Sequence, residues 1–348
     1  MQDSGSRSSP PRRFLGFLVV VAVLAGAISA RYFLTDPNPA MGTGFEARRD
    51  LMGTVWKIQL GTTASERTKQ AVEAAFEEVA RIESVMSEWR PDSPLSAINA
   101  AAGKGPVTVP LELRDILQRS VEFSKLTGGA FDVTWKGMGR LWRFNDSFAV
   151  PSDEEIRTAL TRVDYRQIVF EGDRVGLTKP GMAIGLGGIA KGYAVDRAAA
   201  VLREFGYRDF LVDGGGDVLV SGQRSGGSWR LGIRDPRGGR EDLIAVLKLT
   251  SGAVASSGDY ERFREVDGVR YHHIIDPRTG RPAGGCRAVS VLAPTAEEAD
   301  ALATALFVLG PEKGLEVAER REGTEVMIVD GQGRLRMTPG FRSIAELL

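Results

Sequence analysis

Few side chains in this sequence can carry acid–base or redox chemistry. Among 348 residues there are two histidines, His272 and His273, and one cysteine, Cys286. These counts exclude a disulfide framework, a cysteine-rich or three-histidine zinc site and a paired-cysteine redox centre. Neighbouring residues of a strand point to opposite faces, so at most one histidine should line a given pocket. Because the turn sequence from Asp276 to Gly280 follows, an ordinary surface histidine beside a structural turn remains an alternative.

A glycine-rich stretch from Gly185 to Lys191 opens a predicted helix. Backbone amides at a helix N-terminus, the positive end of the helix dipole and the charge of Lys191 together suit a phosphate group. Gly185, Gly187 and Ala190 also fit the G-x-G-x-x-A fingerprint of a Rossmann NAD site. Against that alternative, the stretch comes late in the chain, and the spacing to the next acidic residue after a strand, Asp213, exceeds the usual ~20 residues. A tight turn into a packed helix, without any ligand, is the third interpretation.

A second candidate site lies on a predicted helix near the end of the chain. Asp300 and Thr304 are four residues apart, so their side chains project from one face of that helix. Carboxylate and hydroxyl oxygens suit a hard cation such as Mg²⁺, which completes its shell with water, backbone carbonyls and phosphate oxygens. The alternative is a solvated aspartate beside a threonine that bonds back to a helix carbonyl.

Charge and the N-terminus bear on partners and location. The 45 Lys and Arg residues balance 45 Asp and Glu residues, so we expect no nucleic-acid partner. Residues 14–28 form an apolar run after three arginines, and small residues follow it, which is typical of an export signal. The run is shorter than the roughly 20 residues of a membrane span. We expect a signal peptide or signal anchor at 1–30, possible inner-membrane association through 14–28, and a periplasmic or otherwise extracytoplasmic protein.

The remaining chain predicts one domain at 51–348 after a linker at 31–50. Hydrophobic periodicity and turn residues predict four helices, several strands and two hairpins. The predicted helices are one with an apolar face of Val72, Phe76, Val79, Ile82 and Val85, one from Pro110 to Gly128, one from Ile189 to Phe205, and a last one opened by a Thr295/Glu298 capping box and burying Ala299, Leu302 and Leu306. The predicted strands are Val55 to Leu60, Phe210 to Val212, Trp229 to Ile233 and Leu243 to Leu249, with hairpin turns at Asp267-Gly268 and Asp330-Gly331. This mixture favours an α+β fold over a regular βαβ array.

Taken together, these segments resemble the ApbE family, the FAD:protein FMN transferases, from Met52 to about Gly310. The segments that carry the resemblance are Met52-Gly53-Thr54, Met86 to Ser93 with Asn99, Gly129 to Thr134, Leu141-Trp142, Leu186 to Asp196, Gly214 to Asp217, Ser256 to Tyr260, His273 to Gly280, and Asp300 to Thr304. The sequence departs from the family pattern at Gly185, where Asp is common, and at Ser256, where Thr is usual.

The resemblance implies an α+β, T-fold-type catalytic domain of mixed antiparallel sheet and helices. It implies Mg²⁺-dependent transfer of FMN from FAD to a Thr or Ser hydroxyl of a target, with release of AMP, and exported acceptor domains of redox flavoproteins as partners. The metal ligands would be Asp300, Thr304 and the carbonyl of Gly188, and the catalytic residues His273 and Lys191. The residues around FAD would be Met52, Trp89, Ala130, Phe131, Asp132, Gly185, Lys191, Ser257, His273 and Ile274. A FAD-binding accessory or carrier protein and a FAD pyrophosphatase remain alternatives.

Overall fold

The computed structural model describes residues 44–139, 141–144, 148–224 and 226–348. The predicted signal or anchor at 1–30 lies outside the described residues. In the described part, no helix is both long and apolar enough to cross a bilayer. The expected linker boundary at residue 50 is wrong, because strand β1 (Phe45–Leu51) pairs in full register with β2 (Thr54–Leu60). β1 is an edge strand with charged and half-exposed residues, so it lacks the hydrophobic signal on which strand prediction depends.

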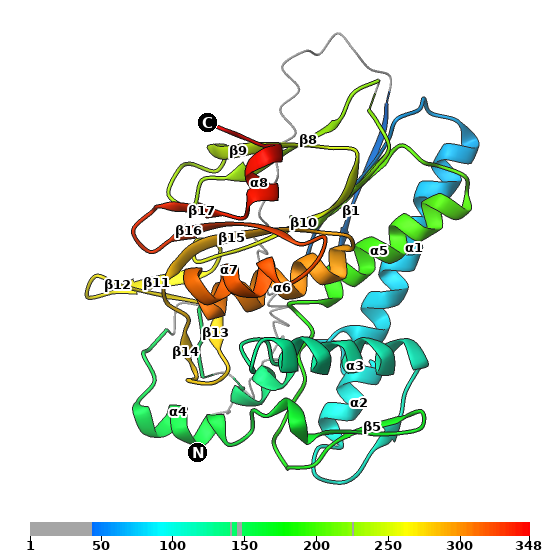
Figure 1. Cartoon of the computed structure of the whole chain (residues 1–348). Coiled ribbons are helices and arrows are strands. Elements are labelled where there is room, and N and C mark those ends of the chain that lie inside the picture. The colour runs from blue at the N-terminus through cyan, green and yellow to red at the C-terminus, as the bar shows by residue number, and fades with distance from the viewer. Residues whose placement is uncertain (1–43, 140, 145–147, 225) are drawn as a thin grey trace, which may run out of the picture.

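An eight-stranded antiparallel sheet forms the centre of the molecule (Figure 1). Its order is β1-β2-β6-β7-β10-β15-β16-β17. The other six strands are β6 (Phe210–Gly214), β7 (Val218–Ser221), β10 (Ser251–Gly258), β15 (Cys286–Ala293), β16 (Glu325–Asp330) and β17 (Leu335–Met337). Every neighbouring pair is antiparallel. The predicted α+β class is confirmed, as is the hairpin at Asp330-Gly331.

Three helices pack against one face of this sheet: α1 (Glu66–Met86), α5 (Ala190–Glu204) and α6 (Ala296–Leu309). The predicted apolar face of α1 is buried at Val72, Phe76, Val79 and Ile82. Each fully buried side chain of this size contributes about 1.5–3 kcal/mol to the free energy of unfolding. These helices and the sheet share one large core, and the N-terminus of α5 and the middle of α6 meet beside β10.

A smaller sheet, β18-β9-β8, covers the other face together with α8 (Pro339–Ile344). Its strands are β8 (Trp229–Arg234), β9 (Leu243–Leu249) and β18 (Ala345–Leu347). Side chains of β6, β7 and β10 that point away from the helices pack against it, including Leu211, Val218 and Val254. The alternation of the strands therefore divides their residues between two separate cores.

The remaining elements lie mainly between α1 and α5 in the sequence or extend from the central sheet. They are α2 (Pro94–Ala100), α3 (Leu111–Leu126), the 3₁₀ helices η1 (Val133–Met138) and η2 (Tyr165–Gln167), α4 (Asp153–Leu160), the small sheet of β3 (Val107–Thr108), β5 (Arg174–Leu177) and β4 (Ile168–Glu171), the hairpins β11 (Phe263–Val266) with β12 (Val269–His272) and β13 (Ile275–Asp276) with β14 (Arg281–Pro282), and α7 (Pro311–Glu319). The hairpin turn at Asp267-Gly268 is confirmed.

Two helix predictions need correction. Pro110 is the N-cap residue of α3 and lies outside the helix. The helix opened by Thr295 is not the last, because α7 and α8 follow it. Half of its predicted capping box is present: Thr295 Oγ1 accepts the amide of Glu298 at 3.3 Å, whereas the Glu298 carboxylate pairs with Arg321 instead. The ion pair with Arg321 thus takes the Glu298 side chain away from the capping position that the local sequence predicted.

Candidate functional site

The two stretches singled out in the sequence meet in space where α5 begins against α6. The ammonium group of Lys191 contacts the carboxylate of Asp217 and lies 3.9 Å from Asp300 Oδ2. The backbone amide of Gly192 donates to Asp300 Oδ2 at 3.2 Å. Asp217 comes from the loop between β6 and β7, so three separate segments supply this charged cluster.

Hydroxyl and backbone groups line the neighbouring part of the cluster. Thr304 Oγ1, one turn beyond Asp300, lies 3.4 Å from Ser257 Oγ at the end of β10. The turn before α5 approaches the same hydroxyl closely, because a Cβ added at Gly188 would lie 3.1 Å from Thr304 Oγ1. The structure therefore brings together Gly188, Lys191, Ser257, Asp300 and Thr304, all of which the sequence predicted as site residues.

Strand alternation explains why the departure at Ser256 does not touch this cluster. Ala255 belongs to the core shared with the helices and Val254 to the opposite core, so Ser257 faces the helices and Ser256 faces away. Ser256 Oγ lies 2.7 Å from Ser290 Oγ on β15.

The electrostatics of the cluster are those of two buried carboxylates around one cation. Burial, followed by the charge of Asp217 beside it, raises the pKa of Asp300 well above its ordinary value. Burial alone would favour the neutral amine of Lys191, but Asp217 and Asp300 overcome this penalty and raise its pKa. Asp300 and Asp217 are 5% and 3% exposed, so one lysine faces two desolvated carboxyl groups.

This arrangement fits an additional hard cation. One ammonium group faces two buried carboxylates, and carboxylate, hydroxyl and backbone oxygens are the ligands that Mg²⁺ prefers. In the described ranges, no group of three or more His, Cys, Asp or Glu side chains has metal-binding geometry. A divalent cation here would therefore depend on Asp300, the hydroxyl of Thr304 and a backbone oxygen such as that of Gly188, with water or phosphate completing its shell.

The two histidines have different surroundings. His272 is buried, its Nε2 lies 2.8 Å from the carbonyl oxygen of Ala283, and its ring meets Phe307 of α6 edge-on at 5.4 Å. His273 is half-buried and follows β12, and its backbone amide donates to the carbonyl of Arg262 at 3.0 Å. Burial, followed by the charges of Arg262 and His272, lowers the pKa of His273 to about 4, so its imidazole is neutral at pH 7. Its Nδ1 accepts no hydrogen bond from the described residues.

The carboxylate of Glu88 occupies the space beside Gly185. A Cβ at Gly185 would lie 2.5 Å from Glu88 Oε2 and 3.0 Å from the Trp135 ring. Glu88 Oε1 accepts from Lys136 Nζ at 2.8 Å, and that ammonium group lies 3.6 Å from the ring centre of Trp89, which is 76% exposed. Glycine at position 185 thus admits a carboxylate from another segment, and the predicted FAD residue Trp89 presents an open aromatic surface beside it.

Other predicted FAD residues are held by the protein itself. Asp132 accepts bonds from the amide and hydroxyl of Thr134 and from the amide of Tyr165, so its carboxylate fixes a turn. Burial nevertheless raises its pKa. Ala130, Phe131 and Ile274 are buried, and Phe131 also lies against Gly188. Met52 occupies the β1–β2 turn at a φ of 50°. Contact of any of these residues with FAD stays a prediction.

Sequence reasoning did not select Asp217 or Glu88 as site residues. Asp217 ends the conspicuous Asp-Gly-Gly-Gly-Asp loop. The loop stands out in the sequence, but the sequence does not show that Asp217 pairs with Lys191. Glu88 lies within a recognised motif, but its approach to Gly185 depends on chain folding across almost a hundred residues. Cys286 is buried, and burial raises the pKa of its thiol to about 12, which makes it unreactive.

Comparison with known proteins connects this geometry to a family. The profile of the ApbE family matches residues 52–328. A FAD:protein FMN transferase of Treponema pallidum is 38% identical, covering 84% of this chain and 86% of that protein. One of Vibrio cholerae is 33% identical, covering 96% and 97%. The crystal structure of the ApbE protein of Thermotoga maritima superposes with a TM-score of 0.79 at 37% identity, covering 86% of this chain and 99% of that one. The chain belongs to the ApbE family.

Proposed function

We propose that this protein is a Mg²⁺-dependent FAD:protein FMN transferase that attaches FMN to a Thr or Ser hydroxyl of a target flavoprotein and releases AMP. The observation that carries the proposal is the meeting of Lys191, Asp300, Thr304 and Ser257 on the helix-facing side of β10. Relatives named FAD:protein FMN transferase, one of them 38% identical, support it.

The reaction is one displacement at phosphorus. The acceptor oxygen bonds to the phosphorus on the FMN side of the pyrophosphate, the bond from that phosphorus to the bridging oxygen breaks, and AMP leaves with the bridging oxygen. The hydroxyl proton is released at the same time, so FAD and the hydroxyl give the phosphoester and AMP without any redox change. The bound cation supplies neutralisation of pyrophosphate charge.

The residues of this chain prepare that displacement. Lys191, fixed by Asp217, directs a permanent positive charge toward the region where phosphate charge develops. The neutral imidazole of His273 can accept the proton of the acceptor hydroxyl, because its lowered pKa keeps it unprotonated at pH 7. Trp89 offers its exposed ring surface to a planar group of FAD.

Purified protein incubated with FAD, Mg²⁺ and a candidate acceptor domain tests the function. We expect stoichiometric AMP and an acceptor that carries FMN covalently, seen as in-gel fluorescence and as the added mass. Formation of FMN and AMP with no labelled acceptor from any flavoprotein domain offered would identify a pyrophosphatase instead. FAD binding without AMP release would identify a carrier.

We also propose that residues 1–30 direct the protein out of the cytoplasm, so that its acceptors are exported domains. The apolar run at 14–28 and the arginines before it support this proposal. Intact mass of the protein recovered from the cell envelope distinguishes a cleaved signal from an uncleaved anchor, and recovery only from cytoplasm would contradict the proposal.

A further inference from the structure

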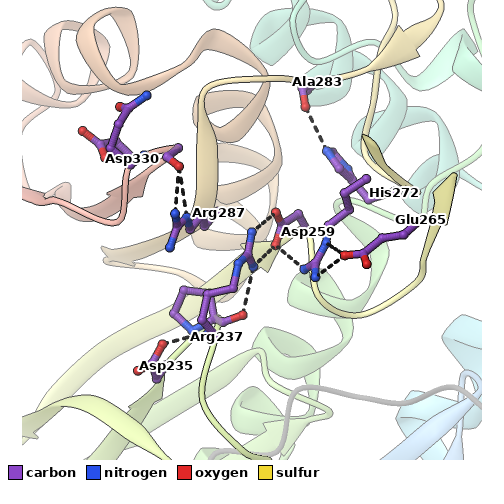
Figure 2. A network of polar contacts seen from close by, with 12 residues as sticks. Asp235, Arg237, Asp259, Glu265, His272, Ala283, Arg287 and Asp330 are labelled. Atoms are coloured by element: carbon purple, nitrogen blue, oxygen red, sulfur yellow. Dashed lines mark hydrogen bonds and ion pairs between the residues drawn. The ribbon is translucent and has the colours of Figure 1, made fainter. Parts of the chain in front are cut away.

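Asp259 is a buried carboxylate outside the cluster around Lys191, and its side chain is 9% exposed. Arg237 binds it through two parallel bonds, Nη1 to Oδ1 at 2.7 Å and Nη2 to Oδ2 at 2.6 Å. Arg270 adds a second guanidinium group, with Nη1 at 3.6 Å from Oδ1. Figure 2 shows Arg237 beside Asp259. Arg237 and Arg270 come from different segments of the chain.

The two arginines connect separate parts of the fold. Arg237 lies in the loop between β8 and β9, where its amide donates to Asp235 Oδ1 at 2.8 Å. Arg270 lies on β12, bonds Glu265 of β11 at 2.8 Å and places its guanidinium 4.1 Å from the ring centre of Phe263. Asp259, just after β10, therefore ties the β11–β12 hairpin to the central sheet and to the β8–β9 loop.

The β11–β12 hairpin needs contacts with the rest of the fold, such as the one between Arg270 and Asp259, to be held in place. In the described chain, β11 and β12 form a sheet of only two strands, and two strands alone are marginally stable in water. An ordered position for the residues that follow β12 therefore has to come from contacts outside the hairpin.

The alternation of side chains along β12 connects the contact between Arg270 and Asp259 to the position of His273. Arg270 and His272 share one face of the hairpin, toward Asp259 and α6. Val269, Tyr271 and His273 fall on the opposite face, because successive residues alternate. The bond from the His273 amide to the Arg262 carbonyl extends the β11–β12 pairing by one step. The position of Arg270, together with the contacts of His272 to Ala283 and Phe307, consequently sets the position of His273.

We infer that Asp259 is a positioning residue for FMN transfer: through Arg237 and Arg270 it holds the β11–β12 hairpin so that His273 is fixed where the acceptor hydroxyl must lie. The inference rests on the proposed function only for the role of His273. Removing the carboxylate leaves Arg237 without its paired anion beside Arg270, which keeps its pair with the exposed Glu265, and the repulsion of the two like charges pushes the hairpin away from the sheet.

The test uses the Asp259→Asn variant of the full chain. We expect kcat for FMN transfer to fall at least tenfold and FAD affinity to fall much less, because the predicted FAD residues other than His273 and Ile274 come from segments outside the β11–β12 hairpin. Partial recovery of kcat is expected for Asp259→Glu, which keeps the anion. Arg237→Gln, at a side chain that is 34% exposed, provides a variant that should fold even where Asp259→Asn does not.

Histidine NMR gives a readout that does not depend on transfer. The chain has only two histidines, so loss of one signal set in His273→Gln assigns the ring of His273. In Asp259→Asn we expect broadened His273 signals and a pKa that rises from about 4 toward its ordinary value, as water reaches a ring now enclosed with Arg262 and His272. This measurement tests the positioning even if wild-type protein transfers no FMN, in which case the proposed function alone fails.

Asp330→Asn is the matched control. Asp330 is a buried carboxylate in another hairpin, and its Oδ2 accepts from Arg334 Nε at 2.7 Å within the β16–β17 turn. This variant should lose stability while keeping kcat and the His273 signals. Unchanged kcat and unchanged His273 signals in Asp259→Asn, or equal losses in both variants, would overturn the positioning role.

Discussion

His272 and His273 are adjacent, and each has a buried Nδ1 with no partner from the described residues. Within the same residues, only the imidazole of His272 is fixed, by the carbonyl of Ala283 at Nε2 and by the ring of Phe307. We expect His273→Gln to lower kcat for FMN transfer by about 10²–10⁴-fold, the usual contribution of a general base. FAD affinity, measured by flavin fluorescence, should change by less than about threefold. Wild-type kcat in this variant would exclude His273 as the base.

Asp300 and Thr304 allow the metal assignment to be tested with shape-preserving substitutions. Asp300→Asn removes a charge and Thr304→Val removes a hydroxyl at nearly constant volume, so both should shift the Mg²⁺ titration of AMP release to at least tenfold higher concentration. Thr304→Ser keeps the oxygen that lies 3.4 Å from Ser257 Oγ and should respond to Mg²⁺ much as wild type does. Unchanged titrations in both of the first two variants would refute these ligands.

Gly185 is a position at which the sequence predicts only part of the local structure. The family pattern commonly has Asp where this chain has Gly185, and the structure places the carboxylate of Glu88 in the space that a side chain there would occupy. The carboxylate is supplied by a different segment and is held by Lys136. The sequence shows that position 185 lacks a carboxylate. Only the folded structure shows that Glu88, from a distant segment, supplies one there.

The contact between α5 and α6 determines where Asp300 lies. Asp196 of α5 accepts the amides of Ala296 and Glu297 at 2.8 and 2.9 Å and so caps α6. Gly192 permits this approach, since a Cβ there would lie 2.1 Å from the Ala296 carbonyl oxygen. The glycine-rich stretch therefore serves helix packing, and phosphate binding by it stays a prediction.

Gly192→Ala measures that packing. Alanine gains about 1 kcal/mol of helix propensity over glycine. The clash is with backbone, which cannot rotate away, and overpacking of this kind costs about 3 kcal/mol or more. We expect a net loss of at least about 2 kcal/mol in urea unfolding. Gly314→Ala in α7 is the comparison, because its nearest contacts are 3.2 and 3.3 Å and include a movable Ile328 methyl. Equal stability of the two variants would contradict this account.

Elements with a local signal were predictable and elements defined by partners were not. The buried stripe of α1 follows from residues three and four apart, and the Asp267-Gly268 hairpin from its turn residues. β1 was missed because pairing with β2 defines it. The motif from Ser256 to Tyr260 contains Asp259, but the sequence does not show its pairing with arginines that lie 22 residues before it and 11 residues after it.

The whole chain has no formal net charge, and the charges of the candidate site are concentrated in one buried cluster. A small polyanion such as FAD needs only that local charge, so a broad basic surface is unnecessary. The same burial that concentrates charge around Lys191 keeps His273 neutral, and burial of a neutral histidine affects the stability of the whole chain.

Stability should therefore depend on pH through His273. Its folded pKa of about 4 lies below the ordinary 6.5, so between these values the unfolded chain binds more protons. The contribution to the free energy of unfolding is complete above pH 6.5 and is lost as the pH falls toward 4, by about 2 kcal/mol between pH 7 and pH 5. His273→Gln cannot bind this proton, while Asp196 and the other titrating groups remain in both proteins. Urea unfolding of both proteins at pH 7 and pH 5 should show the wild type losing about 2 kcal/mol more than the variant, and equal losses would mean that the imidazole of His273 is not shielded from protonation in the folded protein.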